Sequence, residues 1–144
     1  MVKRHFLIYF LIACATLLIS AQEKTPPENP TDDVRQALLG AWVLLGAPDS
    51  EMKPESESYL KFWGERHWCI SASDPRTGKI VYHHGGTYTL DGDNYEETFT
   101  FANEETQHMI GITLKFKIKI DGDIYIQEGI NNKYTQKWKR LTAE

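Results

Sequence analysis

Hydrophobic and polar residues alternate along most of the chain after residue 38, and this alternation predicts β-strands rather than helices. It is clearest over residues 112–120, where apolar side chains at every second position share one face while threonine and lysine take the other. The fourth strand contains Gly85-Gly86, which predicts a β-bulge. We predict strands at residues 39–45, 59–63, 67–73, 79–90, 94–101, 110–120, 123–128 and 133–140.

A short helix is predicted before the first strand. Thr31 or Asp32 can cap its start, Asp33 lies in its first turn, and Gly40 follows its end.

The connections between the predicted strands alternate in length. Tight turns are predicted at residues 64–66, 91–93 and 121–123, and longer loops at residues 46–58, 74–78, 102–109 and 129–132. If the strands run up and down, all the tight turns fall at one end and all the longer loops at the other. We therefore predict an all-β fold, an antiparallel up-and-down barrel of about eight strands, with a closed floor and an open mouth.

Three segments resemble the lipocalin-like (calycin) barrels, in particular small exported bacterial domains with no assigned activity. They are residues 39–42 (Leu-Gly-Ala-Trp), residues 85–93 (Gly-Gly-Thr-Tyr-Thr-Leu-Asp-Gly-Asp) and residues 138–140 (Trp-Lys-Arg). The resemblance implies structural roles for Gly40, Trp42 and Arg140, with Trp42 plugging the floor and Arg140 packed across it. It also implies a barrel interior that can hold a ligand, although the fold alone names none.

The first residues have the order of a secretory signal peptide. Lys3 and Arg4 precede an apolar run over residues 6–19 that ends in Ser20-Ala21. This run is shorter than the roughly 18–20 residues of a spanning helix, so no membrane span is expected after processing. We predict a signal peptide at residues 1–21, a linker at 22–31 and the barrel domain at 32–144. Export would place the protein in the periplasm or outside the cell.

Lipid anchoring is an alternative to simple cleavage. Cys14 ends the stretch Leu-Ile-Ala-Cys, which resembles the site at which bacterial lipoproteins are lipidated. In either case Cys69 is the one cysteine certain to lie in the folded domain, so no intrachain disulfide can form there. Its neighbours Trp68 and Ile70 predict a half-buried strand position.

The alternation also predicts a ligand site. If Phe116 points inward, parity places Phe99, Trp138, Glu97 and Gln136 inward as well, and it brings a largely apolar set that includes Glu128 toward the mouth. The candidate ligand-binding residues are Tyr59, Tyr82, Glu97, Phe101, Ile112, Leu114, Ile126, Glu128 and Tyr134. The alternative is that these side chains simply fill a small barrel.

Glu97 is the most informative of these candidates, because a carboxylate that faces an apolar interior needs a partner, a ligand or a proton. Gln136 or Tyr134 could supply a hydrogen bond, and Arg140 could supply a positive charge.

Acidic residues predict the charge of the ligand. Asp49, Glu51, Glu55 and Glu57 in the first loop, and Glu104 and Glu105 in a later one, would form an acidic rim that favours neutral or cationic molecules. The leading hypothesis is therefore an exported protein that binds a small, mostly apolar, neutral or cationic ligand inside the barrel. The alternative is a filled barrel that acts as a protein-interaction module at the cell envelope.

Other function classes are disfavoured. The formal net charge of −4 argues against nucleic acid as a partner. The chain contains no nucleophile elbow, phosphate loop or dinucleotide fingerprint, so we expect neither an enzyme nor a cofactor. We expect no metal either, because adjacent His83 and His84 point to opposite faces of a strand and only one of them could join His67.

Overall fold

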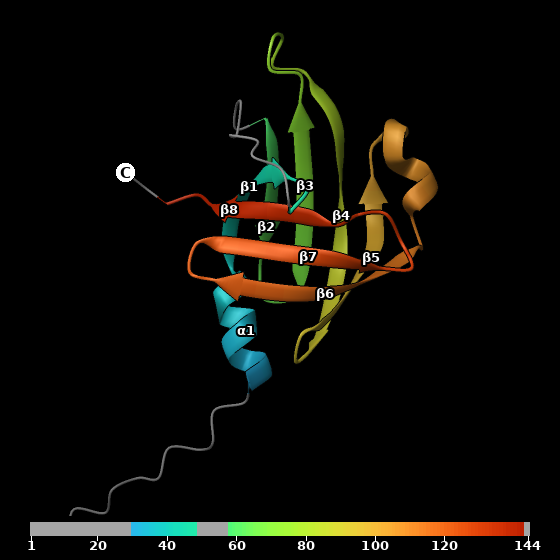
Figure 1. Ribbon diagram of the computed structural model, residues 1–144. Coiled ribbons are helices and arrows are strands. Elements are labelled where there is room, and N and C mark those ends of the chain that lie inside the picture. The colour runs from blue at the N-terminus through green and yellow to red at the C-terminus, as the bar shows by residue number, and fades with distance from the viewer. Residues whose placement is uncertain (1–29, 49–57, 143–144) are drawn as a thin grey trace, which may run out of the picture.

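The computed structural model describes residues 30–48 and 58–142. Within them, eight antiparallel strands follow one another in chain order and close into a barrel, with the last strand paired to the first. A short α-helix precedes the strands (Figure 1). The predicted fold class is confirmed.

The elements follow the predicted order. Their bounds are α1 Pro30–Leu38, β1 Gly40–Gly46, β2 Tyr59–Trp63, β3 His67–Ser73, β4 Ile80–Asp91, β5 Asn94–Ala102, the 3-10 helix η1 Glu104–Met109, β6 Thr113–Asp121, β7 Ile124–Ile130 and β8 Gln136–Arg140. The strands β6 and β8 each begin three residues later than predicted. Before β6, residues 110–112 form a turn that follows η1, with Gly111 at φ 86°. Before β8, Asn132 holds a turn by donating to the carbonyl of Lys115.

The tight turns and the longer connections lie at opposite ends of the barrel, as the sequence predicts. The turns β2–β3, β4–β5 and β6–β7 form the floor, and η1 is part of the mouth. Helix α1 lies against the floor, below the barrel in Figure 1. Among the hydrogen bonds that hold it there, Arg35 donates to the carbonyl of Glu65 (3.0 Å), and the amide of Gly92 donates to Thr31 Oγ1 (3.1 Å).

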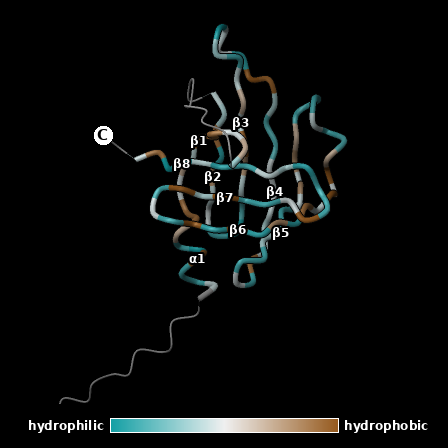
Figure 2. Tube along the Cα trace, viewed as in Figure 1, coloured by the Kyte–Doolittle hydropathy of each residue, from teal (hydrophilic) through white to brown (hydrophobic). Residues whose placement is uncertain are grey.

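Residues on β6 show how alternation builds the barrel wall. Phe116 and Ile118 are buried and Leu114 is half-buried, whereas the lysines between them are exposed. Figure 2 shows the resulting mixture of hydrophobic and hydrophilic positions along the strands. Each strand thus contributes one face to the interior and one to solvent.

The floor half of the barrel is filled by aromatic side chains. The ring of Tyr125 lies 5.6 Å from that of Trp42 and 5.1 Å from that of Trp63. The indole N–H groups of these two tryptophans have partners, since Trp42 donates to the carbonyl of Leu38 (2.9 Å) and Trp63 to the hydroxyl of Tyr95 (2.7 Å). Aromatic rings thus occupy the interior near the floor.

Trp42 and Arg140 are neighbours across the β1–β8 pair that closes the barrel. The guanidinium carbon lies 4.2 Å from the centre of the Trp42 ring, and Arg140 donates to the carbonyls of Ala37 (2.6 Å) and Leu39 (2.9 Å). Gly40 has φ 117° at this junction, a conformation that favours glycine. Arg140 therefore ties the end of α1 to the last strand.

A bulge lies opposite Gly85-Gly86, where the sequence predicts an irregularity, but its extra residue is on β5 and not on β4. Gly85 pairs with Phe101 and Gly86 with Phe99, so Thr100 of β5 is the extra residue. A Cβ atom on Gly86 would lie 1.9 Å from the carbonyl oxygen of Thr98. The bulge thus needs glycine on β4, and it reverses the inward and outward positions on β5 beyond Thr100.

Candidate ligand site

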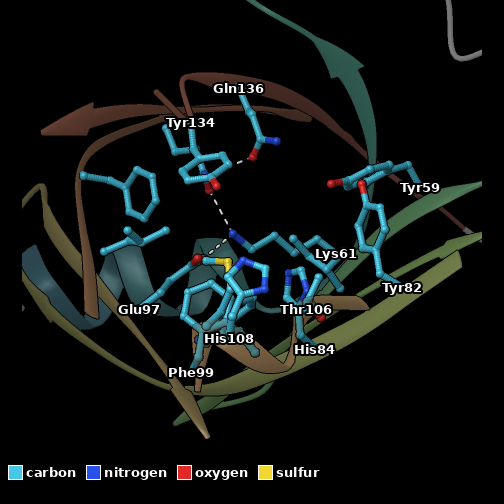
Figure 3. Close-up of a pocket in the computed structure, with 16 residues that line it drawn as sticks. Tyr59, Lys61, Tyr82, His84, Glu97, Phe99, Thr106, His108, Tyr134 and Gln136 are labelled. Carbon is cyan, nitrogen blue, oxygen red and sulfur yellow. Dashed lines mark hydrogen bonds and ion pairs between the residues drawn. The ribbon is translucent and has the colours of Figure 1, made fainter. Parts of the chain in front are cut away.

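The mouth half of the barrel contains a cavity of about 220 Å³. Its walls include Ile70, Phe99 and Phe116 from the strands, with Thr106 and Met109 from η1 at its rim. Figure 3 shows side chains from across the barrel converging on this space. The barrel is therefore filled at the floor and hollow toward the mouth.

Five of the candidate ligand-binding residues line this cavity: Tyr59, Tyr82, Glu97, Leu114 and Tyr134. The rings of Tyr59 and Tyr82 lie 5.4 Å apart at one side of it (Figure 3). Burial and a hydrogen bond with Tyr82 raise the pKa of Tyr59 well above its ordinary value, so its hydroxyl stays protonated.

The prediction that Phe101 and Ile112 face this space is wrong, because neither lines it and each is 42% exposed. The extra residue Thr100 turns Phe101 outward, where its ring lies 5.5 Å from that of His83. Ile112 precedes β6, in the turn after η1, where strand alternation does not hold.

The inward placement of Ile126 and Glu128 is wrong for a different reason. The turn between β6 and β7 pairs Asp121 with Ile124, and this register puts Gln127 opposite the inward Ile118. Residues directly opposite one another share a face of the sheet, so Gln127 points inward. Its two neighbours on β7, Ile126 and Glu128, therefore point outward.

Lys61 is a buried residue of the cavity wall that the sequence did not predict as a ligand contact. Its side chain is 0% exposed, its ammonium forms an ion pair with Glu97, and it donates to Oε1 of Gln127 (2.9 Å). The sequence of β2 contained the information needed to predict this. Tyr59 and Trp63 point inward, and alternation along the strand places Lys61, which lies between them, inward as well.

The partners that Glu97 has in the structure also differ from those predicted. Lys61 and the hydroxyl of Tyr95, which donates over 2.8 Å, occupy its Oε1 oxygen. Gln136 and Tyr134 line the cavity without a hydrogen bond to Glu97. Arg140 lies at the floor against Trp42.

Aromatic rings surround the ammonium of Lys61. Its nitrogen lies 4.5 Å from the ring centre of Trp63, 5.1 Å from that of Trp68 and 5.6 Å from that of Trp138. Burial lowers the pKa of Lys61, and the carboxylate of Glu97 opposes this shift. The two opposite charges compensate each other, so the base of the cavity is polar without carrying net charge.

A chain of amides extends from this ion pair to the opposite wall. Oε1 of Gln127 accepts from both Lys61 and the hydroxyl of Tyr125 (2.8 Å), and its Nε2 donates to Oε1 of Gln136 (3.1 Å). The orientation of both amide groups follows from these contacts.

His84 is a second buried polar residue of the wall that was not a predicted ligand contact. Its ring stacks on Tyr82, with centroids 5.7 Å apart, and its Nδ1 lies 3.2 Å from Thr106 Oγ1. Burial, helped by the charges of Lys61 and His83, lowers the pKa of His84 to about 4. The imidazole is therefore neutral at ordinary pH.

The described part of the chain holds no group of three side chains that could bind a metal ion. Cys69 is a half-buried free cysteine, and burial raises the pKa of its thiol.

Several predicted features lie outside the described residues. These are the signal peptide with Cys14, the linker before Pro30, and four rim acids, Asp49, Glu51, Glu55 and Glu57. Glu104 and Glu105 of η1 are exposed near the mouth. None of the helices in residues 30–48 and 58–142 is long and apolar enough to cross a bilayer.

The fold has counterparts among solved structures. A lipocalin-like protein from Bacteroides uniformis is similar with a TM-score of 0.53 at 14% sequence identity, over 73% of this chain and 99% of that one. An uncharacterized protein from Bacteroides eggerthii is similar with a TM-score of 0.50 at 12% identity, over 72% of this chain and 99% of that one. No protein-family model and no curated protein matches the sequence. The likeness is one of fold, and the chain has the lipocalin-like barrel that its sequence predicts.

Proposed function

We propose that this protein is an exported carrier or receptor for a small, neutral, mostly apolar molecule held in the mouth half of the barrel. The observation that carries this proposal is the cavity of about 220 Å³ above a filled aromatic floor. Concave, largely apolar spaces with a few converging polar groups are typical of small-molecule sites.

The size of the cavity limits the ligand. An apolar protein cavity of about 150 Å³ accommodates benzene. The cavity in the mouth half of this barrel is somewhat larger, at about 220 Å³. We therefore expect a ligand of about one substituted ring rather than a long lipid chain.

The charges at the cavity favour a neutral ligand over the cationic one that the sequence also allowed. Glu97 already interacts with Lys61 and Tyr95, so its carboxylate is not free for a ligand cation. A cation would also meet the buried ammonium of Lys61. An anion would lie close to Glu97, and an uncompensated charge is costly to bury.

Native mass spectrometry of the protein purified from its own source without detergent tests this proposal. We expect a mass excess that disappears on denaturation. In the variant Leu114→Trp the indole would occupy the cavity, so the mass excess should be lost while the barrel remains folded. Ile112→Trp is the matched control, because Ile112 lies two residues away and is exposed outside the cavity. Equal retention in both variants would refute binding in this cavity.

A second candidate is the protein-interaction module. It is favoured by the exposed apolar side chains of Phe101, near the mouth end of β5, and of Ile110 and Ile112, in the turn before β6. A bare polypeptide mass in the experiment above, together with loss of envelope association in Phe101→Ser/Ile112→Ser, would favour this function instead.

A further inference from the structure

A short relay of hydrogen bonds determines which nitrogen of His84 carries the proton. Asn103 donates from Nδ2 to the carbonyl of Val81 (3.1 Å), so its Oδ1 is the acceptor for the hydroxyl of Thr106 (3.1 Å). Thr106 has a single hydroxyl proton, and it is used in this bond. The 3.2 Å contact between Thr106 Oγ1 and His84 must therefore be donated by Nδ1–H of the imidazole.

Nε2 of His84 is consequently a lone-pair acceptor. No described residue forms a hydrogen bond with it, and the side chain lines the cavity. Nε2 of His84 also keeps some accessible surface. If it were fully buried it would be an unpartnered buried polar atom, and among the described side chains Trp138 Nε1 is the one atom of that kind. The lowered pKa of His84 keeps this lone pair available at neutral pH.

The opposite wall presents the complementary group. Oε1 of Gln136 accepts from Gln127, which leaves the Nε2 hydrogens of Gln136 without a partner among the described residues. Gln136 is the first residue of β8 and His84 lies on β4, four strands apart in either direction around the ring of eight. Figure 3 shows the two side chains on opposite sides of the cavity.

We infer that the cavity selects a neutral ring compound with a hydrogen-bond donor at one end and a carbonyl-type acceptor at the other. The donor, an O–H or N–H, meets Nε2 of His84, and the carbonyl oxygen meets the amide N–H of Gln136. The apolar walls, including Ile70, Phe99 and Leu114, contact the ring between them. This inference rests on the proposed ligand-binding function and specifies its ligand class.

A matched series of four small probes tests the inference by calorimetry or by quenching of tryptophan fluorescence. The compound 4-hydroxyacetophenone carries both groups, 4-methylacetophenone lacks the donor, 4-ethylphenol lacks the carbonyl, and 4-ethyltoluene lacks both. We expect the first to bind about tenfold more tightly than either compound that lacks one group, because each loss leaves a buried polar group unpaired.

Two variants assign each preference to its residue. In His84→Phe, 4-hydroxyacetophenone and 4-methylacetophenone should bind equally, while the preference for the carbonyl remains. In Gln136→Leu, 4-hydroxyacetophenone and 4-ethylphenol should bind equally, while the preference for the hydroxyl remains. Circular dichroism establishes that both variants are folded.

The tautomer can be measured without any ligand. Nitrogen-15 NMR should show His84 protonated on Nδ1 at pH 7, and Thr106→Val should lose this strict preference because the acceptor is removed. Protonation on Nε2 in the wild-type protein would overturn the inference. Equal affinity for all four probes, or no binding of 4-hydroxyacetophenone, would overturn the ligand class. A mass excess in native mass spectrometry would in that case still support the binding function.

Discussion

Lys61 and Glu97 form a buried ion pair at the boundary between the filled floor and the cavity. They lie 36 residues apart in the chain, on strands β2 and β5. Trp63 and Tyr95 lie on the floor side of this pair, joined by the hydrogen bond between the indole and the phenol. The pair thus closes the aromatic core with a polar layer and gives the cavity a base without net charge.

Removing one member of this pair should be strongly destabilising. Lys61→Met leaves the carboxylate of Glu97 buried without its cation, which typically costs about 3–5 kcal/mol. The double variant Lys61→Met/Glu97→Gln removes both charges and keeps an acceptor for Tyr95, so it should recover most of this loss. Urea unfolding measures the free energies. A double variant as unstable as the single one would contradict the importance of charge pairing.

Arg140→Met should weaken the closure of the barrel. It removes the contact with Trp42 and the two bonds to the carbonyls of Ala37 and Leu39. We expect a loss of about 2–4 kcal/mol in unfolding free energy. Lys139→Met is the control, because Lys139 is the exposed neighbour on the same strand. Equal melting temperatures for the two variants would refute this role of Arg140.

Gly86→Ala should destabilise the bulge. The added Cβ would lie 1.9 Å from the carbonyl of Thr98, a contact that the backbone can relieve only by moving. We expect a cost of about 3 kcal/mol or more in unfolding free energy. At Gly64 the nearest atom to an added Cβ is 3.8 Å away, so Gly64→Ala should change stability little. Thermal unfolding of both variants makes the comparison.

His84 should make the barrel less stable in mild acid. Its pKa is about 4 in the folded protein, against an ordinary histidine value of 6.5. As the pH falls from 6.5 to 4, the unfolded chain takes up a proton that the folded barrel does not bind, so folding stability decreases across this window and levels off below it.

The variant His84→Phe isolates this effect. The wild-type protein should lose about 1–3 kcal/mol more unfolding free energy than the variant between pH 7 and pH 4. Lys61 and His83 are the charged neighbours that contribute to the lowered pKa, and both remain in the variant. Identical pH profiles in urea unfolding would mean that His84 titrates normally in the folded state.

The sequence by itself determined the architecture. Alternation with a period of two, tight Asp-Gly turns and the Gly85-Gly86 pair are local signals, and each of them predicts an element from its own residues. They were sufficient for the number and order of strands, the bulge, and the arrangement of floor and mouth. The inward positions of Glu97 and Leu114 also followed, because no irregularity separates them from the buried residues of their own strands.

Only the tertiary structure decided which residues form the site. Strand register depends on turn geometry and on the partner strand, and an error of one residue moves a side chain to the other face. This is why Phe101 and Ile126 face outward. The partnership of Lys61 with Glu97 joins two strands that are not neighbours in the sheet, so no local pattern contains it. The size of the cavity depends on the packing of side chains from strands around the whole barrel, a property that becomes defined when the barrel closes.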